Sequence, residues 1–81
     1  MSLVIDVHEI QSLPITVDPE ILGGTPVFRG TRVPVDALLG NLEAGVSIDE
    51  FLENFPTVSR DQVLEVLKFS RATLHRLLKL K

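Results

Sequence analysis

Apolar and polar residues alternate with helical spacing over most of the second half of the chain. Leu38, Leu39 and Leu42 form one apolar stripe among polar and small neighbours. Asp36 follows a Pro-Val pair and is a favourable N-cap residue, and Gly45 suits the left-handed position just past a helix C-terminus. The pattern therefore predicts a first helix that begins at Asp36 and stops at Gly45.

Two capping boxes predict where the next two helices begin. In the first box, Ser47 and Glu50 can satisfy each other's free backbone donors, and Pro56 ends the helix that follows. In the second box, Ser59 and Gln62 have the same arrangement. No helix breaker follows, so the last helix can extend to the end of the chain, over roughly 34 Å. The inward-facing residues of the middle helix are Ile48, Phe51, Leu52 and Phe55.

The last helix carries more leucine than its neighbours can cover. The first two helices are each roughly 14 Å long and cannot span it. Apolar residues continue toward the C-terminus at alternating four- and three-residue steps, which is typical of a packing seam between helices. We therefore expect another chain to cover this seam, so that the protein is a homodimer or a higher oligomer. The candidate seam residues are Leu67, Leu74, Leu77 and Leu78.

The first 35 residues lack this helical period. Residues 1–14 alternate apolar and polar side chains weakly, which favours a strand. Residues 15–35 contain a short extended piece and then a predicted β-hairpin around Gly30-Thr31, because glycine readily adopts the positive φ of a type II′ turn. The predicted fold class is mainly α: a short N-terminal β-hairpin region followed by a three-helix bundle over residues 36–81.

The predicted hairpin brings two arginines together. Pairing around its turn sets Arg29 opposite Arg32 and Phe28 opposite Val33, with the arginines on one face and the apolar pair on the other. Like charges directly opposite each other destabilise a hairpin, so this face requires an anionic partner. The partner is either a group on another molecule or a nearby carboxylate of Asp18, Glu20 or Asp36.

Composition narrows the class of protein. With 81 residues the chain is one small domain, residues 1–81, and such domains are only marginally stable alone. It has no cysteine, so disulfides and thiolate metal sites are excluded. The N-terminus lacks the basic stretch of a signal peptide, and no apolar run approaches the ~20 residues that span a bilayer. We expect a cytoplasmic protein with no membrane association.

The charges are unevenly distributed. Residues 1–56 hold nine acidic residues against two arginines, a balance of −7, whereas residues 57–81 have a balance of +4. An acidic N-terminal part followed by a basic C-terminal part suits head-to-tail protein contacts or a basic partner. The two histidines, His8 and His75, stand far apart, with no further ligand at metal-binding spacing. We therefore expect no metal, no cofactor and no catalytic activity.

The last two helices have the spacing of a helix-turn-helix, although helical hairpins without a nucleic-acid role share it. Residues of the last helix that suit contacts to DNA backbone or base edges are Ser59, Arg60, Gln62 and Lys68. Asp61 and Glu65 lie among them and would repel phosphates. The two sets of residues nearly balance, so DNA binding stays open at this point.

Several short motifs resemble the domain-of-unknown-function family 433 (DUF433) over residues 15 to about 70. They include Gly23-Gly24-Thr25-Pro26-Val27, Gly30-Thr31-Arg32-Val33-Pro34-Val35, Gly45-Val46-Ser47 and Phe55-Pro56. The resemblance implies a homeodomain-like or winged-helix-like three-helix fold. It also implies an antitoxin-like protein of a Vap-type toxin–antitoxin pair, whose usual partner is a PIN-like ribonuclease encoded alongside. Many members have lysine at the position of Thr25, and their C-terminal tails vary.

Three functions are compatible with these observations. The first is an antitoxin-like regulator that binds a PIN-like ribonuclease toxin and its own operator DNA. The second is a protein-interaction adaptor that has the same fold and binds no DNA. The third is a transcription factor that lacks a toxin partner.

Overall fold

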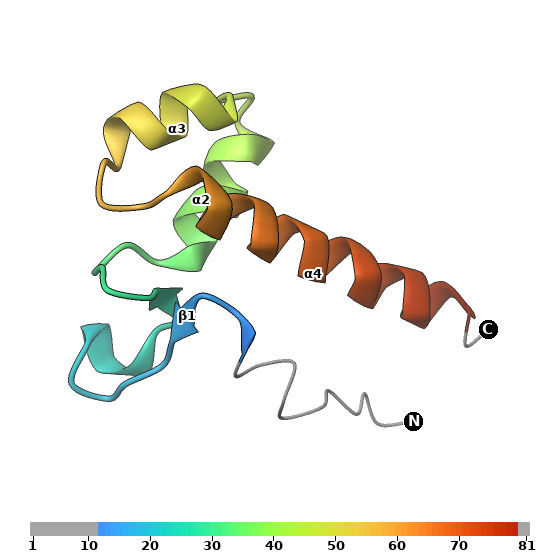
Figure 1. Ribbon diagram of the computed structural model, residues 1–81, viewed down its shortest axis with the longest axis horizontal. Helices are drawn as coiled ribbons and strands as arrows, with labels where there is room; N and C mark the ends of the chain where they lie inside the picture. The colour runs from blue at the N-terminus through green and yellow to red at the C-terminus, as the bar shows by residue number, and fades with distance from the viewer. Residues whose placement is uncertain (1–11, 80–81) are drawn as a thin grey trace.

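The computed structural model describes residues 12–79 and shows a small β region that leads into three α-helices (Figure 1). The predicted fold class is confirmed. The strand favoured within residues 1–14 falls mainly on residues 1–11, which lie outside the described part. The elements are β1 (Ile15–Thr16), a short 3₁₀ turn η1 (Leu22–Gly24), β2 (Val27–Phe28), α2 (Val35–Glu43), α3 (Ile48–Asn54) and α4 (Arg60–Lys79).

The β region has β2 at its centre. Strand β1 pairs with it antiparallel, with Ile15 opposite Phe28. On the other side of β2, Val27 forms an isolated antiparallel bridge with Pro34, and the Phe28 amide donates to the Val33 carbonyl at 3.0 Å. This register confirms the predicted pairing of Phe28 with Val33.

The turn inside that pairing differs from the predicted one. The Thr31 amide donates to the Phe28 carbonyl at 3.0 Å, so the central residues of the turn are Arg29 and Gly30. Gly30 does have a positive φ, of 77°, but it occupies the third position of the turn. The Thr31 hydroxyl explains the shift: it donates to the Phe28 carbonyl and accepts from the Val33 amide, in place of a second ladder hydrogen bond.

Helix α2 begins at Val35 with Pro34 as its N-cap, so the predicted N-cap at Asp36 is wrong. The Val35 amide donates to the Pro26 carbonyl, which supplies by a tertiary contact what a capping side chain would otherwise supply. Asp36 lies in the first helical turn, where its charge suits the helix dipole. The predicted end is confirmed: Gly45 has a φ of 87°, and the hydrogen bonds of a Schellman motif close the helix.

Both capping serines lie where the sequence predicts. The Ser47 hydroxyl accepts from the Glu50 amide at 3.1 Å and starts α3. At α4 the box is reciprocal: the Ser59 hydroxyl accepts from the Gln62 amide at 3.1 Å, and the Gln62 side-chain oxygen accepts from the Ser59 amide at 3.0 Å. These caps position the two helices of the helix-turn-helix unit.

The core lies where the three helices meet β2. Phe28 and Phe51 are fully buried, with ring centroids 6.4 Å apart, and Phe51 also stacks at 4.8 Å on Phe55. The remaining buried core residues are Leu38, Val58, Val63 and Val66. The core therefore takes its residues of α4 from the first two turns of that helix.

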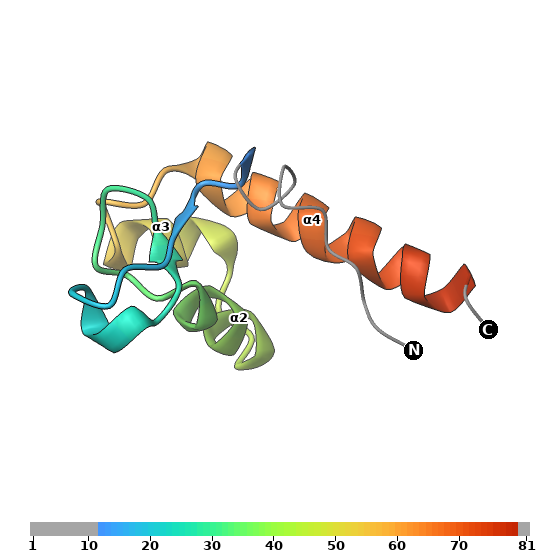
Figure 2. The ribbon, with the colours of Figure 1, turned by 90° about the horizontal axis from the view of Figure 1, so that it is seen from below.

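Helix α4 extends well beyond this core. Figures 1 and 2 show its C-terminal half projecting away from the body that α2, α3 and the β region form. We call residues 71–79 the distal half of α4 and the rest of the described chain the body. Within the described residues, no helix is long and apolar enough to cross a membrane.

Candidate interaction surfaces

Two of the four side chains that were predicted to contact DNA form hydrogen bonds within the fold at the start of α4. Ser59 caps the helix. Gln62 completes the capping box with its oxygen, and its side-chain nitrogen donates to the Arg29 carbonyl at 3.0 Å. The side chain of Gln62 therefore connects α4 to the turn after β2 by a hydrogen bond. No sequence signal beyond the capping box points to this second contact.

Arg60 forms an ion pair with Asp49 of α3, the residue two positions after the Ser47 cap. Both side chains are exposed, at 55% and 76%, so the pair contributes at most about 1 kcal/mol to stability. The ion pair matters more for the surface charge than for the stability, because Asp49 neutralises Arg60, the cation nearest the start of α4.

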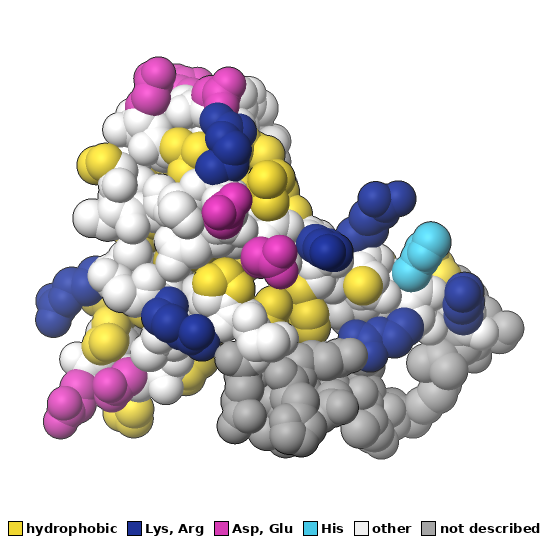
Figure 3. Space-filling model, in the orientation of Figure 1, with side chains coloured by type: hydrophobic (Ala, Val, Ile, Leu, Met, Phe, Trp, Pro, Cys, Tyr) yellow, Lys and Arg dark blue, Asp and Glu magenta, His cyan; other side chains and the backbone are white. Residues whose placement is uncertain are grey.

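The exposed surface around this pair is acidic. Helix α3 contributes Asp49, Glu50 and Glu53, and the first turns of α4 contribute Asp61 and Glu65, all of them exposed. Figure 3 shows acidic side chains gathered over α3 and the start of α4, and basic ones along the rest of α4. The helix-turn-helix surface thus repels phosphates where a recognition helix normally enters the major groove.

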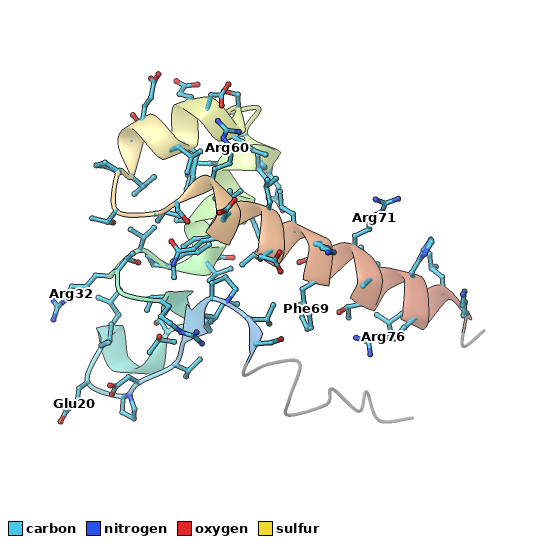
Figure 4. All side chains as sticks on the ribbon, in the orientation of Figure 1. Glu20, Arg32, Arg60, Phe69, Arg71 and Arg76 are labelled. Carbon is cyan, nitrogen blue, oxygen red and sulfur yellow. The ribbon has the colours of Figure 1, made fainter. Side chains whose placement is uncertain are left out.

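The basic residues lie farther along α4. Lys68 is exposed just before the distal half, which adds Arg71, Arg76 and Lys79. In Figure 4, Arg71 points to one side of the helix, whereas Arg76 points to the other side, the same side as Phe69. The positive charge therefore surrounds the distal half of α4 and does not form one flat strip.

Apolar side chains interrupt this charge on one face. Leu74 is 59% exposed and Leu78 is 61% exposed. They share a face with Leu67, because steps of seven and four residues return to the same side of a helix. Leu67 is half-buried against the core. Leu77 is half-buried too and continues the side of α4 that carries buried Val63.

Arg71 lies in the middle of that apolar face, four residues after Leu67. We call Leu67, Arg71, Leu74 and Leu78 the α4 stripe. Two of its leucines are about 60% exposed, and two neighbouring exposed leucines on one helix face make the stripe a candidate interaction surface. The chemistry of the stripe is apolar with a single central cation.

The two hairpin arginines have different environments. The Arg29 guanidinium donates to the Leu13 carbonyl at 2.8 Å, so this side chain holds the segment before β1. Arg32 is exposed, and among residues 12–79 its side chain has neither an ion pair nor a hydrogen bond. The internal salt bridge from Arg32 to Asp18, Glu20 or Asp36 does not form. Asp18 instead accepts from the Glu20 amide at 2.9 Å.

No group of three or more histidine, cysteine, aspartate or glutamate residues within residues 12–79 is placed to hold a metal ion.

One backbone feature was not expected from the sequence. Leu22 has a φ of 48°, in the left-handed region that few non-glycine residues occupy, and Gly23 and Gly24 continue with positive φ.

The three helices, the capped turn and the short sheet define a small, mainly α domain of helix-turn-helix type. Residues 15–70 match the sequence model of a family described as "Protein of unknown function (DUF433)". The match covers more than half of the chain, so the chain belongs to the DUF433 family.

Two proteins are similar to this chain. A crystal structure of a DUF433 member protein from Anabaena variabilis superposes with a TM-score of 0.65 at 22% identity, over 89% of this chain and 71% of that one. The uncharacterized protein y4eO of Sinorhizobium fredii is 45% identical over 49 residues, which are 60% of this chain. The match spans 22% of the length of y4eO. The first likeness concerns the fold alone.

Proposed function

We propose that this protein is an antitoxin-like regulator whose α4 stripe binds a PIN-like ribonuclease toxin. The partner class follows from the family resemblance. The location of the binding surface rests on the exposure of Leu74 and Leu78, two adjacent apolar side chains that the fold itself leaves in solvent.

The leucines of the stripe can supply part of the binding energy. An exposed leucine that becomes fully buried contributes about 1.5–3 kcal/mol, so Leu74 and Leu78 together contribute up to roughly 3–6 kcal/mol, and other contacts supply the rest. Arg71, which lies between Leu67 and Leu74 in the stripe, adds specificity, because a partner surface that covers the stripe must also present an acceptor to the guanidinium. An apolar groove with an acidic residue at its centre meets this requirement.

A second copy of the chain is a further occupant of the stripe when the toxin is absent. With the two stripes facing each other, antiparallel pairing would place Leu67 of one copy opposite Leu78 of the other, and Arg71 opposite Leu74. Parallel pairing would instead oppose Arg71 to its own counterpart. The homodimer is therefore proposed in antiparallel form.

The acidic surface over α3 and the start of α4 opposes binding of operator DNA by the isolated chain. Arg60 is paired with Asp49, while Asp61 and Glu65 are exposed beside it. The isolated chain should bind DNA weakly, and operator binding then depends on surface that the toxin contributes. The same observation favours the alternative function, an adaptor that binds no DNA.

Co-purification with the protein encoded next to this chain tests the proposal. The double variant Leu74→Gln/Leu78→Gln should lose the partner, with affinity lowered roughly a hundredfold or more, while its melting temperature stays unchanged at concentrations at which the chain is monomeric. Leu39→Gln is the matched control, because Leu39 is a 38% exposed leucine on α2. The proposal fails if the double variant retains the partner as well as the control does.

Fluorescence anisotropy with the promoter of the chain's own gene separates the regulator from the adaptor. The regulator should bind this DNA more tightly than random DNA when the partner is present, and its affinity should fall with salt as counterions are released. Equal binding of both DNAs, with and without the partner, would replace the regulator by the adaptor.

A further inference from the structure

A broad groove lies at the end of the molecule opposite to the distal half of α4. It has a volume of about 580 Å³. Its described lining comes from three parts of the chain that are far apart in sequence: Thr16, Ile21, Gly30, Thr31, Arg32, Val33 and Thr57. We propose that this groove binds a segment of another protein in which an apolar side chain stands next to a carboxylate.

Three polar side chains of the groove form no hydrogen bond within the described part of the chain. The Arg32 guanidinium and the hydroxyls of Thr16 and Thr57 have no hydrogen-bond partner within the described part of the chain. Thr31 differs, because its hydroxyl is held between the Phe28 carbonyl and the Val33 amide. One guanidinium and two hydroxyls therefore line the groove as available donors, and a carboxylate is the acceptor that pairs most strongly with the guanidinium.

The rest of the lining is apolar and held in place by the backbone. Ile21 precedes the left-handed run that begins at Leu22, and its carbonyl accepts from the Gly24 amide at 3.1 Å. This turn reverses the chain immediately after Ile21 and fixes that residue at the groove. A positive φ at a leucine costs free energy, and such strained positions cluster at functional sites. Ile21 and Val33 supply the surface for an apolar side chain.

The surrounding charge selects the anion. Asp18 and Glu20 lie in the segment just before Ile21, and Figure 4 shows Glu20 at the same end of the molecule as Arg32. Both carboxylates lie outside the described lining of the groove, in which Arg32 is the single charged residue, and one cation suits a singly charged carboxylate on an apolar segment. It does not suit a dianionic phosphate or the backbone of a nucleic acid, which require several cations.

Nuclear magnetic resonance titration of the full-length protein tests the proposal with N-acetyl-leucine, which carries one apolar side chain and one carboxylate. Its addition should shift the amide signals of Thr16, Arg32 and Thr57, with millimolar affinity. N-acetyl-leucinamide lacks the charge, and Arg32→Gln lacks the guanidinium. Either change should weaken binding about tenfold or more, because hydrogen bonds between charged groups are lost.

Arg71→Gln is the matched control, since it removes an exposed arginine from the α4 stripe and should leave the affinity unchanged. Unchanged melting temperatures of both variants show that the fold is intact. Three results would overturn the proposal: no shift at these residues, equal affinity for the acid and its amide, or tighter binding of inorganic phosphate than of N-acetyl-leucine. None of them bears on toxin binding by the α4 stripe.

Discussion

The body and the distal half of α4 are built on different principles although one helix runs through both. In the body, α4 contributes Val63 and Val66 to a core in which Phe28 and Phe51 are fully buried. In the distal half the same helix exposes Leu74 and Leu78. The second half of α4 is thus longer and more apolar than this fold requires, which is why we propose that its leucines bind a second chain.

The largest contrast is expected between truncations in the two regions. Phe51→Ala should destabilise the protein by about 3–5 kcal/mol, because it removes the central ring of the core and leaves a cavity. Leu78→Ala should change the stability of the isolated protein by less than ~0.5 kcal/mol. Urea denaturation followed by circular dichroism, at concentrations low enough to keep the chain monomeric, measures both. Equal losses would remove the distinction between body and distal half.

Two glycines of the body should respond in opposite directions. Gly45 has a positive φ, and an added Cβ would meet no atom within 4 Å, so Gly45→Ala should cost about 1–2 kcal/mol through the backbone alone. Gly40 lies inside α2 with equally open surroundings, and Gly40→Ala should stabilise by about 1 kcal/mol. Thermal melts of the two variants should move apart. A shared direction would contradict the helix end at Gly45.

Gln62 should matter more for stability than a surface glutamine does. Gln62→Ala removes a hydrogen bond to the Ser59 amide and another to the Arg29 carbonyl, and should cost about 1–2 kcal/mol. Ser59→Ala removes the cap alone and should cost about 1 kcal/mol. Denaturation of both variants checks the order. A loss at Gln62 smaller than that at Ser59 would argue against its link to the β region.

The smallest effect is expected at the ion pair between α3 and α4. Asp49→Asn should cost less than about 1 kcal/mol, since both partners are exposed. The same variant releases Arg60, so DNA affinity measured at low salt should rise slightly if the start of α4 approaches phosphates. A fall in DNA affinity would mean that the pair itself positions Arg60 for binding.

Local signals in the sequence predict most of the fold. Ser47, Ser59 and Gly45 mark helix ends because capping satisfies backbone groups within a few residues. The register that pairs Phe28 with Val33 follows from alternation around a glycine turn. These features depend on neighbours in the chain, which a sequence displays directly.

The features that the sequence did not predict depend on contacts between distant segments. Val35 starts α2 because its amide reaches the Pro26 carbonyl, so Asp36 is not needed as a cap. The second contact of Gln62, with the Arg29 carbonyl, spans 33 residues. The groove around Arg32 draws on Thr16 and Thr57, which no local pattern connects. Of the predicted seam residues, Leu74 and Leu78 are exposed and Leu67 and Leu77 are half-buried. That another chain covers them stays a prediction.

Truncation at the boundary between the two regions tests the central claim most directly. A chain that ends at Arg71 keeps the whole described core and loses Leu74 and Leu78. Light scattering of the full-length and truncated proteins, each alone and mixed with the neighbour-encoded protein, should show a folded truncated monomer that joins no complex. The full-length chain should form both the homodimer and the complex. A truncated protein that still forms the complex would contradict the claim. A full-length protein that stays monomeric both alone and in the mixture would contradict it too.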